Sequence, residues 1–326
     1  MPRRRQASSP HSEIDISCGL PCLPGGPAEA NDDMLIIEDL TQIYPNGTQA
    51  LNGVRLTVPN GLFSLLGPNG AGKSTLMRTI ATLQKPTSGS IRFGDIDVLA
   101  TPQLLRHTLG YLPQDFGVYP RVSVYDLLEH MAVLKGVASI GERKDTVESL
   151  LRQVNLWEVR HKAVAGFSGG MRQRFGIAQA LIGNPRLIIV DEPTAGLDPE
   201  ERNRFLNLLA EIGEQVVVIL STHIVEDVAE LCPRMAVLAR GRVLLEGEPL
   251  ALIRRLQGAV WGKTVHKVEL PAYVSGHEVI STRLVGGRPL LHVLADSRPG
   301  PGFEQLEPTL EDVYFATLRS AQRAVA

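Results

Sequence analysis

One stretch of sequence decides the fold: Gly67-Pro68-Asn69-Gly70-Ala71-Gly72-Lys73-Ser74-Thr75. It fits the pattern G-x-x-x-x-G-K-[ST], in which glycines let backbone N–H groups curl around phosphate oxygens. In this pattern the lysine reaches the β- and γ-phosphates and the hydroxyl binds Mg²⁺, roles that fall to Lys73 and Ser74. The apolar run 62–66 predicts a buried strand, and residues 74–84 predict a helix whose N-terminus faces the phosphates. An ordinary glycine turn is the alternative, which this context disfavours.

A second segment, residues 187–192, is an apolar strand that ends in two consecutive carboxylates, Asp191 and Glu192. Consecutive strand residues point to opposite faces, so these acids cannot share one role. Asp191 is expected to hold Mg²⁺ through water, and Glu192 to polarise the water that attacks the γ-phosphate. A strand end capped by two solvated acids is the alternative, which the complete phosphate loop upstream disfavours.

A third segment, Ser168-Gly169-Gly170, precedes a helical pattern over 171–182 that Gly183-Asn184-Pro185 stops. A serine hydroxyl and glycine amides at a helix N-terminus form an anion site. The phosphate loop already surrounds the phosphates from one side. The second anion site therefore indicates phosphate held from the opposite side by another subunit. A plain N-cap followed by flexible glycines is the alternative.

These three segments resemble those of the ATP-binding subunits of ABC transporters, and the resemblance extends from about residue 35 to 246. The phosphate loop, the signature segment at 168–170 and the paired acids occur in the family's order. Four further positions match the family: an adenine-stacking aromatic, the Q-loop glutamine, the D-loop aspartate that ends Ala195-Gly196-Leu197-Asp198, and the switch histidine. In this sequence they are Tyr44, Gln114, Asp198 and His223.

The resemblance implies ATP and Mg²⁺ as cofactors. The expected catalytic residues are Lys73, Gln114, Glu192 and His223, and the expected metal ligands are Ser74, Gln114 and Asp191. The residues expected to contact ATP are Tyr44, Gly67, Pro68, Asn69, Gly70, Ala71, Gly72, Lys73, Ser74, Thr75, Ser168, Gly169, Gly170 and Asp198.

The four further residues also have ordinary interpretations. Tyr44 lies just before a turn, where a ring is commonly a core or hairpin residue. Gln114 taken alone is a solvated loop amide. His223 follows an apolar strand and is alternatively a helix-capping or core histidine. Asp198 before Pro199 is a well-formed helix N-cap, which is compatible with a role at a dimer interface.

The signature segment departs from the family at two positions. Phe167 and Met171 stand where the family usually has leucine and glutamine. The hydroxyl of Ser168 and the glycine amides are retained, so we still expect ATP to be held between two subunits.

Composition agrees with this interpretation. The chain has 326 residues, 44% hydrophobic and 21% charged, as expected for a soluble globular protein of about two domains. A formal net charge of −2 gives no general attraction to nucleic acid or to an anionic membrane. No apolar run approaches the roughly 18 residues that span a bilayer, so a membrane partner must be another chain. Cys18, Cys22 and Cys232 support neither a disulfide framework nor a zinc site.

The predicted fold class is α/β: a P-loop NTPase core with a mainly parallel sheet, an antiparallel β-subdomain, an inserted helical subdomain and a small C-terminal α+β appendage. Residues 1–33, rich in Pro, Ser and Gly, are expected to be a disordered tail. Residues 34–246 are expected to form a nucleotide-binding domain, with the helical subdomain at about 115–165. Residues 247–326 are expected to form an accessory domain.

Several elements are predicted inside these domains. A hairpin of strands opens the nucleotide-binding domain, a capping box of Ser123 and Asp126 starts a helix, and Thr309 opens the last helix. The predicted strands are 34–38, 54–58, 235–238, 242–245, 265–270, 280–285 and 290–294, and a further helix is predicted at 144–154.

The expected function is that of an ATP-hydrolysing motor that closes as a homodimer or heterodimer and drives a separately encoded transmembrane permease. The basic N-terminus lacks the apolar segment of a secretory signal, so we expect a cytoplasmic protein, peripheral on the inner face of the cell membrane through the permease. Residues 309–314 resemble the C-terminal region of ATPases that serve export-type bacterial permeases. Two alternatives stay open, a soluble ABC ATPase acting on nucleic acid or ribosomes and a low-turnover regulatory subunit; the main hypothesis involves no nucleic acid.

Overall fold

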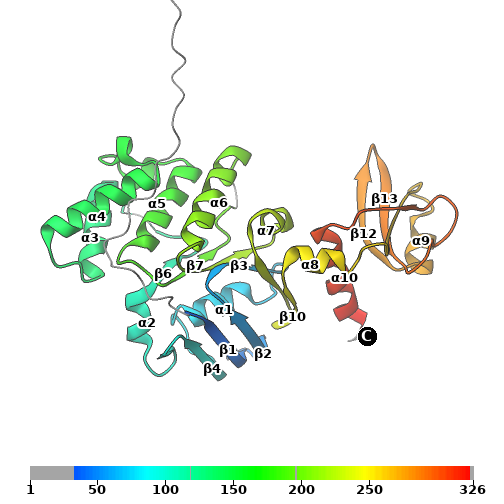
Figure 1. The fold of residues 1–326 in the computed structure, drawn as a ribbon, viewed down its shortest axis with the longest axis horizontal. Coiled ribbons are helices and arrows are strands. Elements are labelled where there is room, and N and C mark those ends of the chain that lie inside the picture. The colour runs from blue at the N-terminus through cyan, green and yellow to red at the C-terminus, as the bar shows by residue number, and fades with distance from the viewer. Residues whose placement is uncertain (1–32, 118, 195–196, 324–326) are drawn as a thin grey trace, which may run out of the picture. The chain divides into compact units, whose positions relative to one another are not determined.

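The computed structural model describes residues 33–117, 119–194 and 197–323 (Figure 1). The predicted tail, except for Asp33, and the D-loop residues Ala195 and Gly196 lie outside these ranges. Within them, residues from Asp33 onward belong to one compact unit. Among the described residues, none of the helices combines the length and apolar character needed to cross a lipid bilayer.

A six-stranded sheet forms the centre of this unit. Its five strands from β9 to β6 are parallel, and β10 joins the edge antiparallel to β9. The predicted mainly parallel sheet is therefore confirmed. In order across the sheet the strands are β10 (Arg242–Gly247), β9 (Arg234–Ala239), β3 (Gly61–Leu66), β8 (Val217–Thr222), β7 (Leu187–Asp191) and β6 (Leu109–Leu112).

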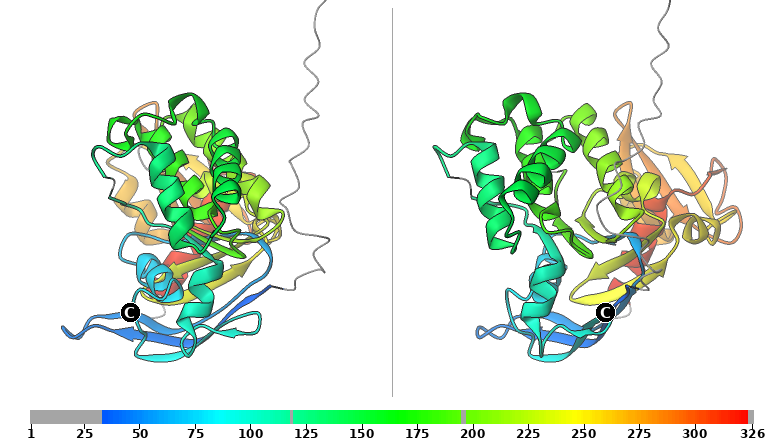
Figure 2. Two further views of the ribbon diagram at one scale, coloured as in Figure 1. Left: turned by 90° about the vertical axis from the view of Figure 1, so that its left-hand side faces the viewer. Right: turned by 60° about the vertical axis from the view of Figure 1, so that its left-hand side comes forward.

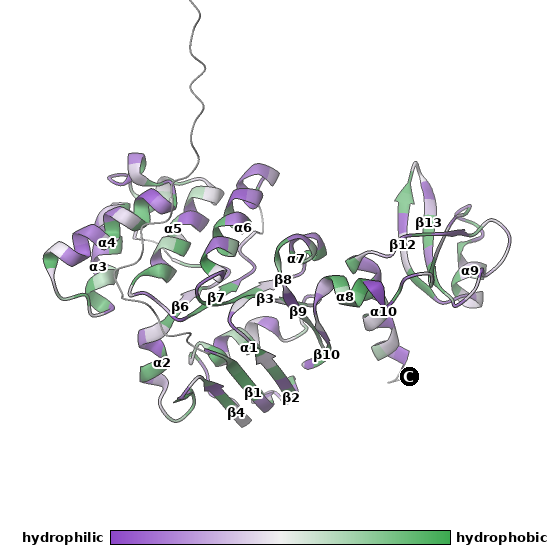
Figure 3. Cartoon of the chain, in the orientation of Figure 1, coloured by the Kyte–Doolittle hydropathy of each residue, from purple (hydrophilic) through white to green (hydrophobic). Residues whose placement is uncertain are grey.

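The strands of the central sheet carry mostly hydrophobic residues (Figure 3), and these residues are buried on both faces, as in a parallel sheet between two layers. Successive residues of one strand enter different cores: Ile188 and Val190 join one cluster, whereas Leu187 and Ile189 join the other. This alternation follows from the two-residue period of a strand. The sheet is thus held by a helical layer on one face and by α1 (Lys73–Ile80) with a second sheet on the other.

The second sheet is antiparallel, as predicted, and has the order β2-β1-β4-β5. Helix α1 contacts β2 of this sheet and also β7 and β8, so it lies between the two sheets (Figure 2). Helix α2 (Pro102–Thr108) connects the antiparallel sheet to β6. The strands are β1 (Leu35–Ile43), β2 (Gln49–Val58), β4 (Ser88–Phe93) and β5 (Ile96–Asp97).

Helices cover the other face of the central sheet (Figure 2). The predicted capping box is present, because Ser123 Oγ accepts the backbone N–H of Asp126 at 3.1 Å at the start of α3. The elements of this layer are α3 (Val124–Leu134), α4 (Ile140–Gln153), the short 3₁₀ helices Trp157–Val159 and Val164–Gly166, α5 (Gly169–Leu181), α6 (Pro199–Gly213) and α7 (Val225–Leu231).

The C-terminal part contains a third sheet of order β12-β13-β11-β14, which packs a small core of its own. Helix α10 packs against α7, α8 and β10 as well as against β12 of this sheet, and its Val313 and Tyr314 belong to the same core cluster as Val228 of α7. The elements are α8 (Pro249–Arg254), β11 (Val260–Thr264), α9 (Leu270–Gly276), β12 (Val279–Val285), β13 (Arg288–Leu294), β14 (Glu304–Gln305) and α10 (Leu310–Arg323). The domain limits at 33, 246 and 247 stay a prediction.

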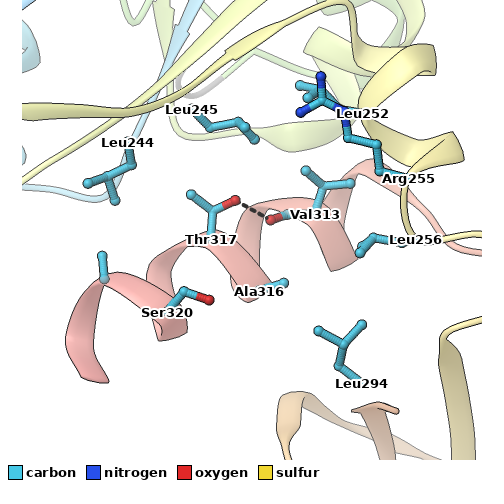
Figure 4. Close-up of a pocket in the computed structure, with 11 residues that line it drawn as sticks. Leu244, Leu245, Leu252, Arg255, Leu256, Leu294, Val313, Ala316, Thr317 and Ser320 are labelled. Atoms are coloured by element: carbon cyan, nitrogen blue, oxygen red, sulfur yellow. Dashed lines mark hydrogen bonds between the residues drawn. The ribbon is translucent and has the colours of Figure 1, made fainter. Parts of the chain in front are cut away.

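A pocket of about 500 Å³ lies between β10, α8 and α10 (Figure 4). Leu245, Leu256 and Val313 are among the side chains that line it, and most of its lining is aliphatic. It is separate from the residues expected to contact ATP, none of which lines it.

One predicted strand is wrong. The expected strand 265–270 is instead a turn followed by the start of α9, and the strand of this region is β11, which ends at Thr264. The backbone N–H of His266 is taken by the carboxylate of Glu269 at 3.0 Å, which turns the chain away from the sheet. Val268, which the pattern placed inside a strand, is 89% exposed. The hairpin around Gly286-Gly287 and the helix after Thr309 are confirmed.

Candidate functional site

The phosphate loop joins β3 to α1, as the strand and helix signals predicted. Gly70 and Gly72 have φ angles of 78° and 107°, which L side chains rarely adopt. A Cβ on Gly72 would also lie 2.5 Å from the carbonyl oxygen of Ala50, and one on Gly67 would lie 2.2 Å from that of Leu238. Backbone conformation requires Gly70, close approach requires Gly67, and both reasons apply to Gly72. The loop that they form leads directly into the N-terminus of α1.

Lys73 is the first residue of α1, and its side chain is 5% exposed. Its Nζ donates to the carbonyl oxygen of Gly67 at 2.6 Å, which folds the side chain back over the loop. The same Nζ lies 3.3 Å from Oε1 of Glu192. The cation is therefore held at the loop, beside one of the two predicted acids.

The two acids have different surroundings. Asp191 ends β7, is 3% exposed, and its Oδ1 has no hydrogen-bond partner among the described residues. Glu192 lies beyond the strand with φ 49°, in the left-handed region, and its backbone N–H donates to the carbonyl oxygen of Ser221 at 2.9 Å. The two consecutive acids thus have different partners: none is found for Oδ1 of Asp191 among the described residues, whereas Glu192 lies beside Lys73.

His223 follows β8, and its Nδ1 lies 2.9 Å from Oε2 of Glu192. Glu192 is thus placed between Lys73 and His223. Lys73, Glu192 and His223 follow β3, β7 and β8, respectively. These are neighbouring parallel strands, and the three residues meet at the carboxyl ends of the strands. Open α/β sheets place ligand-binding groups at this edge.

The signature segment begins α5 as an N-cap. Ser168 Oγ accepts the backbone N–H of Met171 at 3.2 Å, and Ser168 and Gly169 are exposed. A Cβ on Gly170 would lie 2.6 Å from Oε2 of Glu201 on α6. Phe167, one of the two departures from the family pattern, is 7% exposed and packs in the core beneath the helical layer. Ser168 is therefore the N-cap of α5, which the alternative interpretation also required, and the expected contact of this segment with ATP stays a prediction.

Tyr44 lies beside the phosphate loop. Its hydroxyl is 3.2 Å from Oγ1 of Thr75, and it donates to Oε1 of Gln84 at 3.4 Å. Gln114 is exposed after β6, and within the described part of the chain its side chain makes no hydrogen bond. Asp198 caps α6 by accepting the backbone N–H of Glu201 at 2.9 Å, with Pro199 as the first helical residue.

The structure thus brings Lys73, Glu192 and His223 into direct contact and places Tyr44 beside the phosphate loop. It brings neither Gln114 nor Ser168 into contact with that group in the described residues. The roles assigned to all the site residues stay predictions.

Three residues of this region were missed by the sequence analysis. Oγ1 of Thr194 donates to Oδ2 of Asp227 at 3.1 Å, and Nε of Arg202 donates to Oδ1 of the same carboxylate at 2.6 Å. Thr194 and Asp227 are 4% and 2% exposed. Burial raises the pKa of Asp227, and the hydrogen bonds from Arg202 and Thr194 oppose that rise. No sequence spacing links these residues, although an acid on an otherwise apolar helix face is a usable signal.

Comparison with known proteins finds related sequences and similar structures. The family model described as ABC transporter matches residues 51–195. An uncharacterized ABC transporter ATP-binding protein, YxlF of Bacillus subtilis (strain 168), is 33% identical over 303 residues, which are 88% of this chain and 100% of the relative.

Two further relatives differ in the direction that their names state. The methionine import ATP-binding protein MetN of Cupriavidus metallidurans (strain CH34) is 35% identical over 80% of this chain and 79% of its own length. The Nod factor export ATP-binding protein I of Rhizobium meliloti (strain 1021) is 36% identical over 81% of this chain and 82% of its own length.

A solved structure described as the dimeric structure of MJ0796, a bacterial ABC transporter cassette, has a TM-score of 0.61 and 28% sequence identity. The match covers 66% of this chain and 98% of that chain. The fold is therefore that of an ABC-type ATPase cassette, and the predicted P-loop NTPase class is confirmed.

The chain belongs to the ABC transporter family. It is an ATP-binding subunit of that family and an ATPase.

Proposed function

We propose that this ATPase hydrolyses ATP with the residues at the carboxyl ends of β3, β7 and β8, and that it does so at an interface between two nucleotide-binding domains. The observation that carries the proposal is the group formed by Lys73, Glu192 and His223. Nζ of Lys73 lies 3.3 Å from Oε1 of Glu192, and Nδ1 of His223 lies 2.9 Å from Oε2 of the same carboxylate.

The chemistry follows from these positions. Water held by Glu192 attacks the γ-phosphorus, and the bond from this phosphorus to the oxygen that bridges the β-phosphate breaks. The proton of the water passes toward the Glu192 carboxylate as the new P–O bond forms. Lys73 and His223 face the γ-phosphate oxygens, where negative charge lies in the transition state.

A magnesium ion fits the residues beside this group. Mg²⁺ prefers oxygen ligands, and Oδ1 of Asp191 is a buried carboxylate oxygen that lacks a partner in the described residues. Asp191, the Ser74 hydroxyl and Gln114 would hold the ion. When bound, Mg²⁺ would neutralise part of the negative charge of the phosphates.

The dimer is supported by the exposure of Ser168 and Gly169 and by the dimeric cassette to which this chain is similar. The phosphate loop of one subunit and the signature segment at 168–170 of the other would enclose each ATP, with Tyr44 stacking on adenine. Asp198 then lies near the interface as well as capping α6. Residues of both copies complete each site, so closure requires nucleotide.

The motor works on a separate transmembrane permease, which places this subunit peripherally on the inner face of the membrane. The relatives named for import and export both support such a partner. We propose export as the direction, because residues 309–314 resemble the C-terminal region of ATPases that serve export-type permeases.

The test compares phosphate release by the parent protein and by Glu192→Gln. Turnover should fall roughly 10²–10⁴-fold while ATP binding is retained. With ATP and Mg²⁺, the hydrolysis-blocked variant should elute as a dimer in size-exclusion chromatography, and adding Ser168→Arg should return it to a monomer. Full turnover by Glu192→Gln contradicts the assigned base, and a strictly monomeric ATP complex contradicts the shared site.

A further experiment separates the motor from the two remaining classes of function. Phosphate release is measured with and without membranes that contain a co-expressed candidate permease, and with RNA. Stimulation by the permease supports the transport motor. Stimulation by RNA alone indicates an ATPase that acts on nucleic acid, and turnover that stays near the background in every case indicates a regulatory subunit.

A further inference from the structure

Asp227 is a buried carboxylate that joins three segments around the hydrolysis site. It lies on α7, four residues after His223, and is 2% exposed. Its Oδ2 accepts the Thr194 hydroxyl at 3.1 Å, and its Oδ1 accepts Nε of Arg202 on α6 at 2.6 Å. One side chain therefore connects the segment after Glu192, the helix after the D-loop and the helix after the switch histidine.

These contacts close a ring of interactions. Glu192 is followed two residues later by Thr194, whose hydroxyl binds Asp227, and Asp227 belongs to the helix that begins just after His223. His223 in turn contacts Glu192, with Nδ1 2.9 Å from Oε2. The distance between the acid and the histidine is thus restrained both by their own contact and by the Thr194–Asp227 hydrogen bond behind them.

The backbone of Glu192 needs such a restraint. Its φ of 49° is uncommon for a residue with a side chain and costs energy that the surroundings must supply. On the side of β8, the Ser221 carbonyl oxygen accepts its N–H at 2.9 Å. On the downstream side, the Thr194–Asp227 hydrogen bond fixes the chain.

We propose that Asp227 is a positioning residue for ATP hydrolysis, which acts through Thr194 on Glu192 and through α7 on His223. This proposal rests on the role proposed for Glu192. Arg202 balances the charge of the buried carboxylate and ties it to α6, so that movement of α6 or α7 changes the geometry of the water-activating acid.

The mildest test is Thr194→Val, which removes one hydroxyl, keeps the side-chain volume and leaves the Asp227–Arg202 pair in place. The turnover number at saturating ATP should fall about 10- to 100-fold, because small displacements of a catalytic group have effects of this size. The KM for ATP should change by less than about threefold, since the substitution leaves the phosphate loop unchanged. Thr317→Val is the matched control, because that hydroxyl donates to the Val313 carbonyl of its own helix and not to a residue of the ring.

Variants of the carboxylate test the other half of the ring. Asp227→Asn keeps an oxygen that can accept the Thr194 hydroxyl but loses the anion that faces Arg202, whereas Asp227→Ala loses both. Turnover should decrease in that order, and Asp39→Asn, which breaks an exposed ion pair with Arg55, should leave it unchanged. Thermal unfolding of each variant shows whether it is folded at the assay temperature.

The decisive measurement places Thr194→Val in the Glu192→Gln background. If the threonine acts through Glu192, it should lower the turnover of the parent but not the residual turnover of Glu192→Gln. An equal loss in both backgrounds, or unchanged turnover of a folded Thr194→Val protein, overturns the positioning role. These outcomes can be told apart from failure of the proposed function. In that case the single variant Glu192→Gln, with Thr194 intact, would keep full turnover.

Discussion

Nζ of Lys73 lies 3.3 Å from Oε1 of Glu192, and the two side chains are only 5% and 11% exposed. The lysine that we propose to face the γ-phosphate is therefore paired with the acid that we propose to activate water. If the proposed roles hold, phosphate oxygens and the carboxylate compete for one cation. Binding of ATP would then weaken this ion pair, and the carboxylate would repel the incoming phosphate.

We therefore expect Glu192→Gln to bind ATP more tightly than the parent protein, by about two- to tenfold, which corresponds to at most about 1.4 kcal/mol. Equilibrium titration with ATP measures the change. Glu200→Gln is the matched control: Glu200 pairs with Arg204 at 2.5 Å but is 75% exposed on α6, and its removal should leave ATP affinity unchanged. Weaker binding by Glu192→Gln would show that the carboxylate supports the nucleotide instead of opposing it.

Gly72→Ala should destabilise the phosphate loop through two costs, the unfavourable backbone angle and a steric clash of the new Cβ. The φ of 107° costs an alanine about 1–2 kcal/mol, and the new Cβ would lie 2.5 Å from the backbone oxygen of Ala50, which adds an overpacking cost of about 1–3 kcal/mol. ATP binding should be lost, because the loop amides move.

Gly287→Ala separates the two contributions. Gly287 has φ 78°, and nothing lies within 4 Å of the position of its Cβ, so only the backbone cost applies. Urea unfolding should show a smaller loss of stability than for Gly72→Ala, and ATP binding should be unaffected. Equal losses in the two variants would contradict the clash at Ala50.

The local part of the site was predictable from the sequence, because it depends on short-range chemistry. The phosphate loop lies between a strand and a helix, as the apolar run before it and the helical pattern after it indicated. The caps at Ser123, Ser168 and Asp198 were predictable for the same reason, since each depends on a side chain and an amide three residues away.

The contacts between distant segments were not predictable in this way. The Lys73–Glu192 and Thr194–Asp227 pairs depend on strand order, which brings β3, β8 and β7 side by side. The left-handed backbone conformation of Glu192 cannot be predicted from the alternation of apolar and polar residues.

The wrong strand at 265–270 has a local cause. Val265, Val268 and Leu270 mimic a strand pattern, but Pro271 in the first turn of α9 cannot donate to a sheet ladder. The carboxylate of Glu269 accepts the N–H of His266, which turns the chain before the helix. The proline and this turn therefore outweigh the apolar pattern.

Cys232 should be inert toward thiol reagents in the folded protein. It ends α7, is 5% exposed, and burial raises the pKa of its thiol to about 12. At pH 8 about one molecule in ten thousand would carry the reactive thiolate, roughly 10³-fold fewer than for an ordinary thiol. In a Cys18→Ser, Cys22→Ser background, alkylation by iodoacetamide should be at least about 10³-fold slower in the native protein than in urea. Equal rates would show that the end of α7 opens readily.

The C-terminal part should lose stability when Asp312 is neutralised. Asp312 on α10 is 1% exposed, and its Oδ1 lies 2.6 Å from Nδ1 of His292 on β13. Its Oδ2 also accepts the N–H and the hydroxyl of Thr309, both at 2.9 Å. Asp312→Asn should therefore cost about 1–3 kcal/mol at pH 7, the usual size for a hydrogen bond to a buried charged group. Asp126→Asn, at an exposed helix cap, serves as the control and should cost less.

The pH dependence of this loss has a defined sign. Burial acts to raise the pKa of Asp312, but the hydrogen bonds from His292 and Thr309 outweigh burial and hold that pKa below its usual value. A carboxyl group whose folded-state pKa is lowered stabilises the fold fully above its unfolded pKa of about 3.9. This stabilisation disappears as the pH falls further, through the lowered pKa.

The difference in free energy of unfolding between the parent and Asp312→Asn should thus be constant from pH 7 to about 5 and shrink below about pH 4. Fluorescence of Trp261 on β11, in a Trp157→Phe background, follows this sheet during urea unfolding. A difference that widens as the pH falls from 7 to about 4 would mean that Asp312 is already protonated in the folded protein at neutral pH.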